Sequence, residues 1–200
     1  MSSTAKGFEL FVRIANRIAE ARSDVRFVVI GSPETPYGFE QTFLRSKYGV
    51  ESTPTFAEHV MREHAADSSR FTFTGFLSHE AFDATVQMID LFLYPLQFGS
   101  WNWGLLELLA QGAVVVASNR CYLPEVIRHG VNGYLLDYHD LPAWVSLALS
   151  LLDDRGARTR VADEARTASE AYRVERVAPR YLEFFESVVS ASVDQSRPRV

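Results

Sequence analysis

The sequence has very little cysteine, no long hydrophobic run and no excess of basic residues. Its one cysteine, Cys121, excludes an intramolecular disulfide and fits a reducing compartment, so we expect a cytoplasmic protein. No stretch approaches the roughly 20 apolar residues of a membrane-spanning helix, and residues 1–6 lack the apolar core of a signal peptide. The net charge of -5 provides no basic patch of the kind that binds nucleic acid. We therefore expect neither a nucleic-acid partner nor an integral membrane segment.

Histidine is also scarce and is not spaced for a metal site. His59 and His64 have no third ligand at a spacing typical of a metal centre, so no metal is expected. His79 follows Ser78, a residue type that often caps a helix start. His79 therefore either lies exposed in the first turn of a helix or reaches a ligand.

Apolar runs of strand length alternate along the chain with longer stretches of helical periodicity. The 200 residues are 47% hydrophobic, which is enough for one α/β domain with a sizeable core. Because most connections between the strands contain a helix, we predict a doubly wound parallel sheet with right-handed crossovers. The strands are predicted near residues 26–30, 71–74, 91–94, 113–117 and 134–136.

The chain divides into one domain and a short tail. The domain is predicted over residues 1–192, with a helical insert at 39–69, and residues 193–200 are predicted to be a disordered tail. Residues 174–191 place apolar side chains close to helical spacing and form a C-terminal helix. An apolar stripe that stays exposed favours association, so a homodimer through this helix is one expectation.

The strongest functional signal is a helix that begins just beyond an apolar strand. The helix is predicted from Trp103 to Gln111, and Gly112 suits the left-handed position that follows a helix. Its start lies beyond the carboxyl end of the strand at 91–94, where ligands bind in doubly wound sheets. Free backbone N–H groups and the helix dipole at this start favour an anion such as a diphosphate. The groups concerned belong to Trp103, Gly104 and Leu105.

Several side chains of this region have two readings, which stay open. Glu107, one turn inside the helix, either accepts hydrogen bonds from a ribose diol or acts as a charge on the helix dipole. Trp101 and Trp103 either wall a sugar pocket or pack in the core. Glu125 either faces the cleft or caps a short helix.

Three segments together carry a family resemblance: GLLELLAQGAVVVAS (104–118), LPEVI (123–127) and HGVNGYLLD (129–137). This series resembles the nucleotide-binding half of the GT-B glycosyltransferases, in particular the retaining enzymes of glycosyltransferase family four, also called group 1. Further upstream, Lys6-Gly7-Phe8 with DVRFVVIG at 24–31 resembles the opening of that half. Together with the strands at 71–74 and 90–95 and the turns that follow them, the resemblance extends from Lys6 to about Asp153.

The resemblance implies a Rossmann-like half of a GT-B fold that binds a nucleotide diphosphate sugar and needs neither a metal nor another cofactor. Lys6 would reach the diphosphate of the donor, and Glu107 would hold the ribose; these two are the predicted catalytic residues. The predicted binding residues are Asn102, Trp103, Gly104 and Leu105 for the diphosphate, with Phe76 and Leu77 in the turn whose backbone receives the base.

This chain departs from the common family pattern in ways that bear on activity. The pattern has a glutamate eight positions before the one at Glu107, where this chain has Gly99, and a glycine where it has Asn102. A branch of the family that reads SWSLLEAM also lacks that glutamate, and Trp103–Glu107 resembles it more closely, which favours a functional variant. Compared with the family pattern, we expect the first strand of the domain, with its glycine-arginine pair, and the N-terminal acceptor half to be missing from this chain. The resemblance therefore implies a fragment, or a partner-dependent half, of a longer enzyme, inactive alone.

The predicted function is transfer of a sugar from a nucleotide diphosphate sugar to an acceptor, with retention of anomeric configuration. One alternative is a non-catalytic nucleotide-binding or assembly module on the same scaffold, because a fold does not establish a function. Another alternative is a protein similar to the sugar-nucleotide epimerases, which should place histidines at the cleft.

Overall fold

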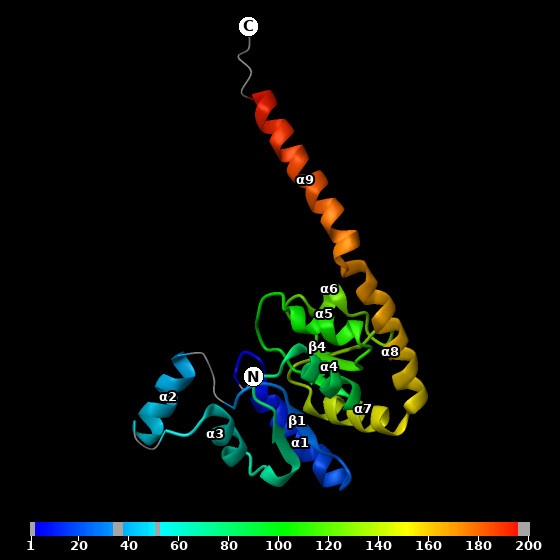
Figure 1. Ribbon diagram of the computed structural model, residues 1–200. Coiled ribbons are helices and arrows are strands. Elements are labelled where there is room, and N and C mark those ends of the chain that lie inside the picture. Colours follow the sequence, from blue (N-terminus) through cyan, green and yellow to red (C-terminus); the bar gives the residue numbers. More distant parts are fainter. Residues whose placement is uncertain (1–2, 34–37, 51–52, 196–200) are drawn as a thin grey trace.

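The computed structural model describes residues 3–33, 38–50 and 53–195, in which helices and short strands alternate (Figure 1). The elements in chain order are α1 (Phe8–Ala21), β1 (Phe27–Val29), α2 (Gly38–Tyr48), α3 (Phe56–Glu63), η1 (Ser68–Arg70), β2 (Phe71–Phe73), α4 (His79–Met88), β3 (Phe92–Tyr94), α5 (Trp103–Ala110), β4 (Val115–Ser118), α6 (Leu123–Val126), β5 (Tyr134–Leu136), α7 (Leu141–Asp153), α8 (Arg155–Ser169), η2 (Glu170–Tyr172) and α9 (Val174–Gln195).

The strands of the described residues form two separate parallel sheets. β1 pairs with β2, and Phe27 lies opposite Phe71. In the other sheet β4 lies between β3 and β5, with Val116 opposite both Leu93 and Tyr134. Each of these ladders is parallel, as expected for apolar strands joined through helices. The predicted α/β class with parallel strands is thus confirmed.

β4 is the central strand of the larger sheet, and its side chains enter two cores. Val116 packs with Ile14 of α1 and Trp144 of α7 on one face. Val115 packs with Leu105 of α5 on the other face, in a cluster that also includes residues of α4 and α6. Helices therefore cover both faces of this sheet, which explains why every residue of β4 is buried.

The predicted helical insert is present as α2 and α3. α3 begins at a complete capping box, in which the Thr55 hydroxyl accepts from the Glu58 amide and the Glu58 carboxylate accepts from the Thr55 amide. Leu44, Phe56 and Val60 of the two helices pack with Val12 of α1 in a third core cluster. α2 lies on the outer side of α3, away from the strands (Figure 1).

The C-terminal helix is longer than the sequence pattern predicted. α9 continues to Gln195, so residues 193–195 are helical and the predicted disorder from residue 193 is wrong there; residues 196–200 lie outside the described part. The sequence offers no helix breaker between Ser187 and Pro198, which explains the extra turn. α9 leaves the body of the molecule (Figure 1). Several of its apolar side chains are exposed, among them Tyr181, Phe184 and Phe185. Within the described residues, none of the helices combines the length and apolar character needed to cross a membrane.

His59 predicts a pH dependence of folding stability. Burial, with a smaller contribution from the positive charge of Lys47, lowers the pKa of His59 below its ordinary value of 6.5. As the pH falls, His59 binds a proton in the unfolded chain before it does so in the folded protein. The free energy of unfolding therefore decreases below a pH of about 6.5. The melting temperature should therefore fall more between pH 8 and pH 5.5 in the wild type than in His59→Gln. His79→Gln, which changes an exposed histidine, is the control. An equal fall in wild type and His59→Gln would contradict this account.

Candidate functional site

A cavity of about 660 Å³ lies between β1 and β3. Doubly wound sheets bind ligands beside the carboxyl ends of their strands, and one end of this cavity lies there. Lys6, Asn102 and Gly104, three predicted site residues from distant parts of the sequence, line this end of the cavity together with Tyr94 and Pro95.

Lys6 belongs to a short N-terminal loop that packs on the segment after β3. The carbonyl of Ala5 accepts hydrogen bonds from the backbone amides of Gln97 at 3.0 Å and Phe98 at 3.3 Å. The amide of Lys6 donates to the hydroxyl of Ser3 at 3.2 Å, and Ser3 itself is fully buried. This loop holds the half-buried Lys6 at the mouth of the cavity.

Gly7 makes this arrangement possible. Its φ of 73° lies in the left-handed region. A Cβ atom on Gly7 would also lie only 1.7 Å from the carbonyl oxygen of Pro95. The Lys6-Gly7 pair therefore has a physical explanation, because only glycine lets the loop lie directly on the chain that leaves β3.

Glu40 is a residue of this region that the sequence pattern did not single out. Its side chain is buried, with 2% of the residue exposed. Its carboxylate accepts a hydrogen bond from the backbone amide of Thr4, which ties α2 to the Lys6 loop. An acid in the first turn of a helix is ordinarily read as a charge on the helix dipole, so only the tertiary packing reveals this contact.

The helix beside the cavity begins at Trp103, as predicted, but its first amides are not free. Asn102 caps α5: its side-chain oxygen accepts from the Gly104 amide at 2.8 Å, and its backbone oxygen accepts from the Leu105 amide at 3.3 Å. The expectation of free N–H groups at Gly104 and Leu105 is therefore wrong, because asparagine is a strong N-cap residue. Gly112 follows the helix with a φ of 77°, as predicted.

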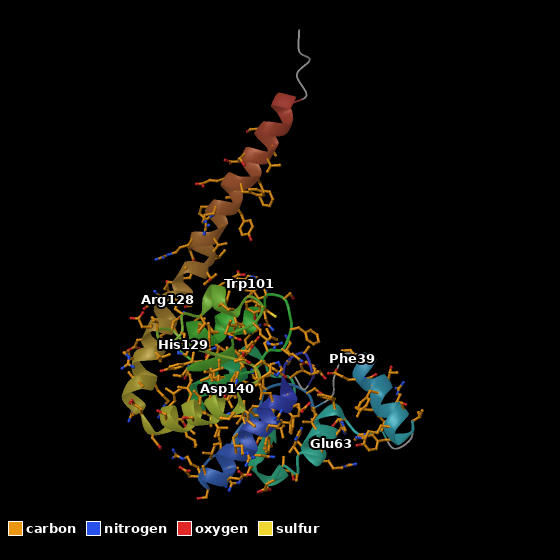
Figure 2. All side chains as sticks on the ribbon, turned by 180° about the vertical axis from the view of Figure 1, so that it is seen from behind. Phe39, Glu63, Trp101, Arg128, His129 and Asp140 are labelled. Carbon is orange, nitrogen blue, oxygen red and sulfur yellow. The ribbon has the colours of Figure 1, made fainter. Side chains whose placement is uncertain are left out.

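The remaining α5 residues point in different directions. The Leu105 side chain is completely buried in the core, so only its backbone is near the cavity. Trp103 is 78% exposed, and Glu107 is also exposed on the helix surface, outside the residues that line the cavity. The Trp101 ring stacks on Tyr122 with centroids 4.9 Å apart, but the residue is 48% exposed and does not pack in the core. Figure 2 shows Trp101 at the end of the body from which α9 leaves.

The predicted base-binding turn follows the carboxyl end of β2. A bridge between Gly31 and Gly75 holds the start of this turn beside the end of β1. Phe76 is 88% exposed and Leu77 is half-buried, and neither lines the cavity. The Ser78 side chain caps α4 as predicted, by accepting from the Ala81 amide at 3.2 Å. The turn is thus exposed, and it lies at the same edge of the fold as the carboxyl end of the cavity.

Two other predicted candidates lie on the surface. His79 is exposed in the first turn of α4, and Glu125 is exposed in α6. This position of His79 agrees with the interpretation that it is an exposed residue of the first helical turn. Among the described residues, no three histidine, cysteine, aspartate or glutamate side chains come together in a way that could hold a metal ion.

The electrostatics of the cavity differ between its two ends. At the carboxyl end, Lys6 supplies a positive charge and the described lining residues include no carboxylate; Asp24 and Asp90 lie at the other end, before β1 and β3. Burial raises the pKa of the Tyr94 hydroxyl far above its ordinary value, so this phenol stays neutral. A cation beside neutral hydrogen-bonding groups suits an anionic ligand.

The parallel strands, the two helical layers and the cationic loop at the carboxyl edge define a Rossmann-like domain of the GT-B type. Its fold is similar to that of Anabaena Alr3699/HepE, solved in complex with UDP, with a TM-score of 0.73, 19% identity and coverage of 92% of this chain and 46% of that one. It is also similar to the C-terminal domain of a glycosyl transferase group 1 family protein (LpcC) from Francisella tularensis, with a TM-score of 0.66, 20% identity and coverage of 85% and 80%.

The sequence places the chain in one family. The family model described as "Glycosyl transferases group 1" matches residues 1–154, so the chain belongs to the group 1 glycosyl transferases. The D-inositol 3-phosphate glycosyltransferase of Xylanimonas cellulosilytica is 34% identical over 182 residues, which are 90% of this chain and 39% of that protein. Spore coat protein SA of Bacillus subtilis is 26% identical over 190 residues, with coverage of 92% and 46%. The chain thus spans less than half the length of these relatives.

Gly7→Ala should destabilise the protein strongly, because the new methyl group would collide with the Pro95 carbonyl at a left-handed backbone position. We expect a loss of more than about 1 kcal/mol in the free energy of unfolding by urea. Gly130→Ala is the matched control, since Gly130 has a φ of 75° but no neighbour among the described residues within 4 Å of the place that its Cβ would take. Equal losses in the two variants would show that the contact with Pro95 is unimportant.

Asn102→Ala should lower the free energy of unfolding by about 1 kcal/mol, because it removes the side-chain oxygen that caps α5. Asn102→Asp keeps an acceptor at the same place and should recover most of this loss. The measurement is denaturant unfolding of the three proteins under identical conditions. If Asn102→Ala were as stable as the wild type, the side-chain cap would contribute nothing to the stability of the domain.

Proposed function

We propose that this chain is the donor-binding half of a retaining glycosyltransferase, which transfers a sugar from a nucleotide diphosphate sugar to an acceptor. The observation that carries the proposal is the meeting of Lys6, Asn102 and Gly104 at the carboxyl end of one cavity. Membership of the group 1 glycosyl transferases and the likeness to a structure solved with UDP support the same choice of ligand.

In this proposal the diphosphate lies between the Lys6 loop and the start of α5. The Lys6 ammonium neutralises the charge that develops on the diphosphate as it leaves the sugar, so it acts on the rate as well as on binding. The Asn102 side chain has its oxygen committed to the Gly104 amide, and its NH2 group donates to a phosphate oxygen. The N-terminal dipole of α5 favours the same negative charge. In this proposal these groups stabilise the diphosphate without a metal or another cofactor.

The nucleoside occupies the edge of the fold beside the diphosphate. Glu107 accepts hydrogen bonds from the ribose, and backbone groups near Phe76 and Leu77 receive the base. The exposed position of Glu107 on α5 leaves its carboxylate accessible for this role.

The acceptor is bound by a further, N-terminal half, which is consistent with a chain that spans 46% and 39% of two curated relatives. The exposed apolar face of α9 suits contact with that half or with a second copy of the chain. A reducing compartment such as the cytoplasm suits the exposed free thiol of Cys121. Without the acceptor half, the present chain would bind the donor but not transfer its sugar.

A non-catalytic nucleotide-binding module is the second candidate. It is favoured by Gly99, which stands where the common family pattern has a glutamate, and by the lack of a carboxylate among the described residues that line the carboxyl end of the cavity. An epimerase-like function has less support, because His79 lies exposed and outside that lining.

Calorimetric titration with UDP, GDP and ADP tests the donor site. One nucleotide should bind, and Lys6→Ala and Glu107→Ala should each weaken binding by about 1 to 3 kcal/mol, because each removes a charged partner of the ligand. Glu125→Ala removes an exposed carboxylate on α6 and serves as the control that should bind normally. If none of the three nucleotides binds, or if all variants bind as well as the wild type, the proposed site is wrong.

A further inference from the structure

The α2 helix contacts the rest of the molecule through one narrow side. Within residues 39–48, the buried ones are Glu40 and Leu44, which are four residues apart and therefore lie on the same side of the helix. Tyr48 continues this side by a further turn; it is half-buried, and its hydroxyl lies 2.9 Å from Nδ1 of His59 in α3. The other residues of this range are exposed, so α2 is held at three successive turns.

The three contacts reach different parts of the fold. Leu44 packs with Val12 of α1 in the third core cluster, and Tyr48 meets α3. Glu40, at the other end of the helix, reaches the N-terminal loop, where its carboxylate accepts a hydrogen bond from the Thr4 amide. Hydrogen bonds to a carboxylate are roughly twice as strong as neutral ones, and burial strengthens them further. The Glu40 contact therefore connects α2 firmly to this loop.

Thr4 begins the turn that contains Lys6. Its carbonyl accepts a hydrogen bond from the Gly7 amide at 2.9 Å, which closes the turn. Hydrogen bonds hold this turn from two sides, because the Ala5 carbonyl accepts from the segment after β3 and the Thr4 amide donates to Glu40 of α2. The position of the Lys6 side chain therefore depends on α2 as well as on the segment after β3.

We infer that Glu40 is a positioning residue for the diphosphate: through the Thr4 amide it sets the place of the Lys6 ammonium. Glu40 itself is not among the residues that line the cavity. The inference rests on the proposed function, in which Lys6 is the cation of the donor site. A coupling between two sites is reciprocal, so a diphosphate held by Lys6 stabilises the contact of α2 with the loop.

The small buried surface of α2 makes this coupling measurable. Segments with few buried apolar contacts open locally at a low cost in free energy, and Leu44 is the one apolar residue that α2 buries within residues 39–48. A ligand that stabilises the contact of Glu40 with Thr4 therefore lowers the population of molecules in which α2 is open.

Calorimetric titration with UDP, GDP and ADP, and with the nucleoside of whichever one binds, tests the role of Glu40. Glu40→Ala should weaken binding of that nucleoside diphosphate at least about fivefold. It should leave binding of the nucleoside unchanged, because a nucleoside has no diphosphate for Lys6 to hold. Glu40→Gln keeps an acceptor oxygen and should restore most of the affinity. Tyr48→Phe is the matched control, since it removes the hydrogen bond at the other end of α2 and should bind normally.

A double-mutant cycle shows whether the effect passes through Lys6. If Glu40 acts by placing the Lys6 ammonium, Glu40→Ala should cause no further loss of affinity in a protein that already carries Lys6→Ala. Two independent effects would add instead. A merely structural role of Glu40 would not produce the non-additive result.

Amide hydrogen exchange measures the reciprocal effect. The bound nucleoside diphosphate should slow exchange at Leu44 of α2 in the wild type, and it should not do so in Glu40→Ala. Exchange at Val116 in the buried β4 shows in each sample that the domain is folded.

The possible results separate this inference from the proposed function. If Lys6→Ala weakens binding and Glu40→Ala does not, the inference is overturned and the proposed function stands. The inference is also overturned if the losses from the two substitutions add, or if the ligand slows exchange at Leu44 equally with and without Glu40. If none of the three nucleoside diphosphates binds to the wild type, the proposed function and the inference fail together.

Discussion

The two sheets are held together by side-chain packing around α1, without a hydrogen-bonded ladder between them in the described part of the chain. Ile14 and Ile18 of α1 share one core with Phe27 of the smaller sheet and Val116 of the larger sheet. Phe8 and Val12, on the same helix, pack with the insert in another core. Because a close-packed interior transmits displacements, the relative position of the two sheets depends on the position of α1 between them.

The start of α1 lies at the edge of the molecule where the ligand site is proposed. Gly7 ends the N-terminal loop directly on the Pro95 carbonyl, and this contact fixes both the first turn of α1 and the place of Lys6. Glu40 adds a hydrogen bond to the same loop from the insert. The loop that leads into α1 thus also positions the cation of the proposed diphosphate site, which links the packing of α1 to the geometry of that site.

Much of the fold follows from local sequence, and the exceptions have physical causes. The apolar run at 113–117 is a local signal, and β4 (Val115–Ser118) overlaps the range that it predicted. The turn at Gly112 and the cap at Ser78 are likewise local and were predicted.

Contacts between distant segments were not predictable from periodicity. The buried Glu40 carboxylate meets Thr4 across the insert, and the Trp101 ring stacks on Tyr122; both depend on the assembled tertiary structure.

The central claim, that the carboxyl end of the cavity binds a nucleotide diphosphate, is tested most directly by mapping backbone amide chemical shifts while UDP is added. The account predicts that the largest changes fall on Lys6, Gly7 and Gly104. Changes confined to α7 and α8, or none at saturating UDP, would contradict it.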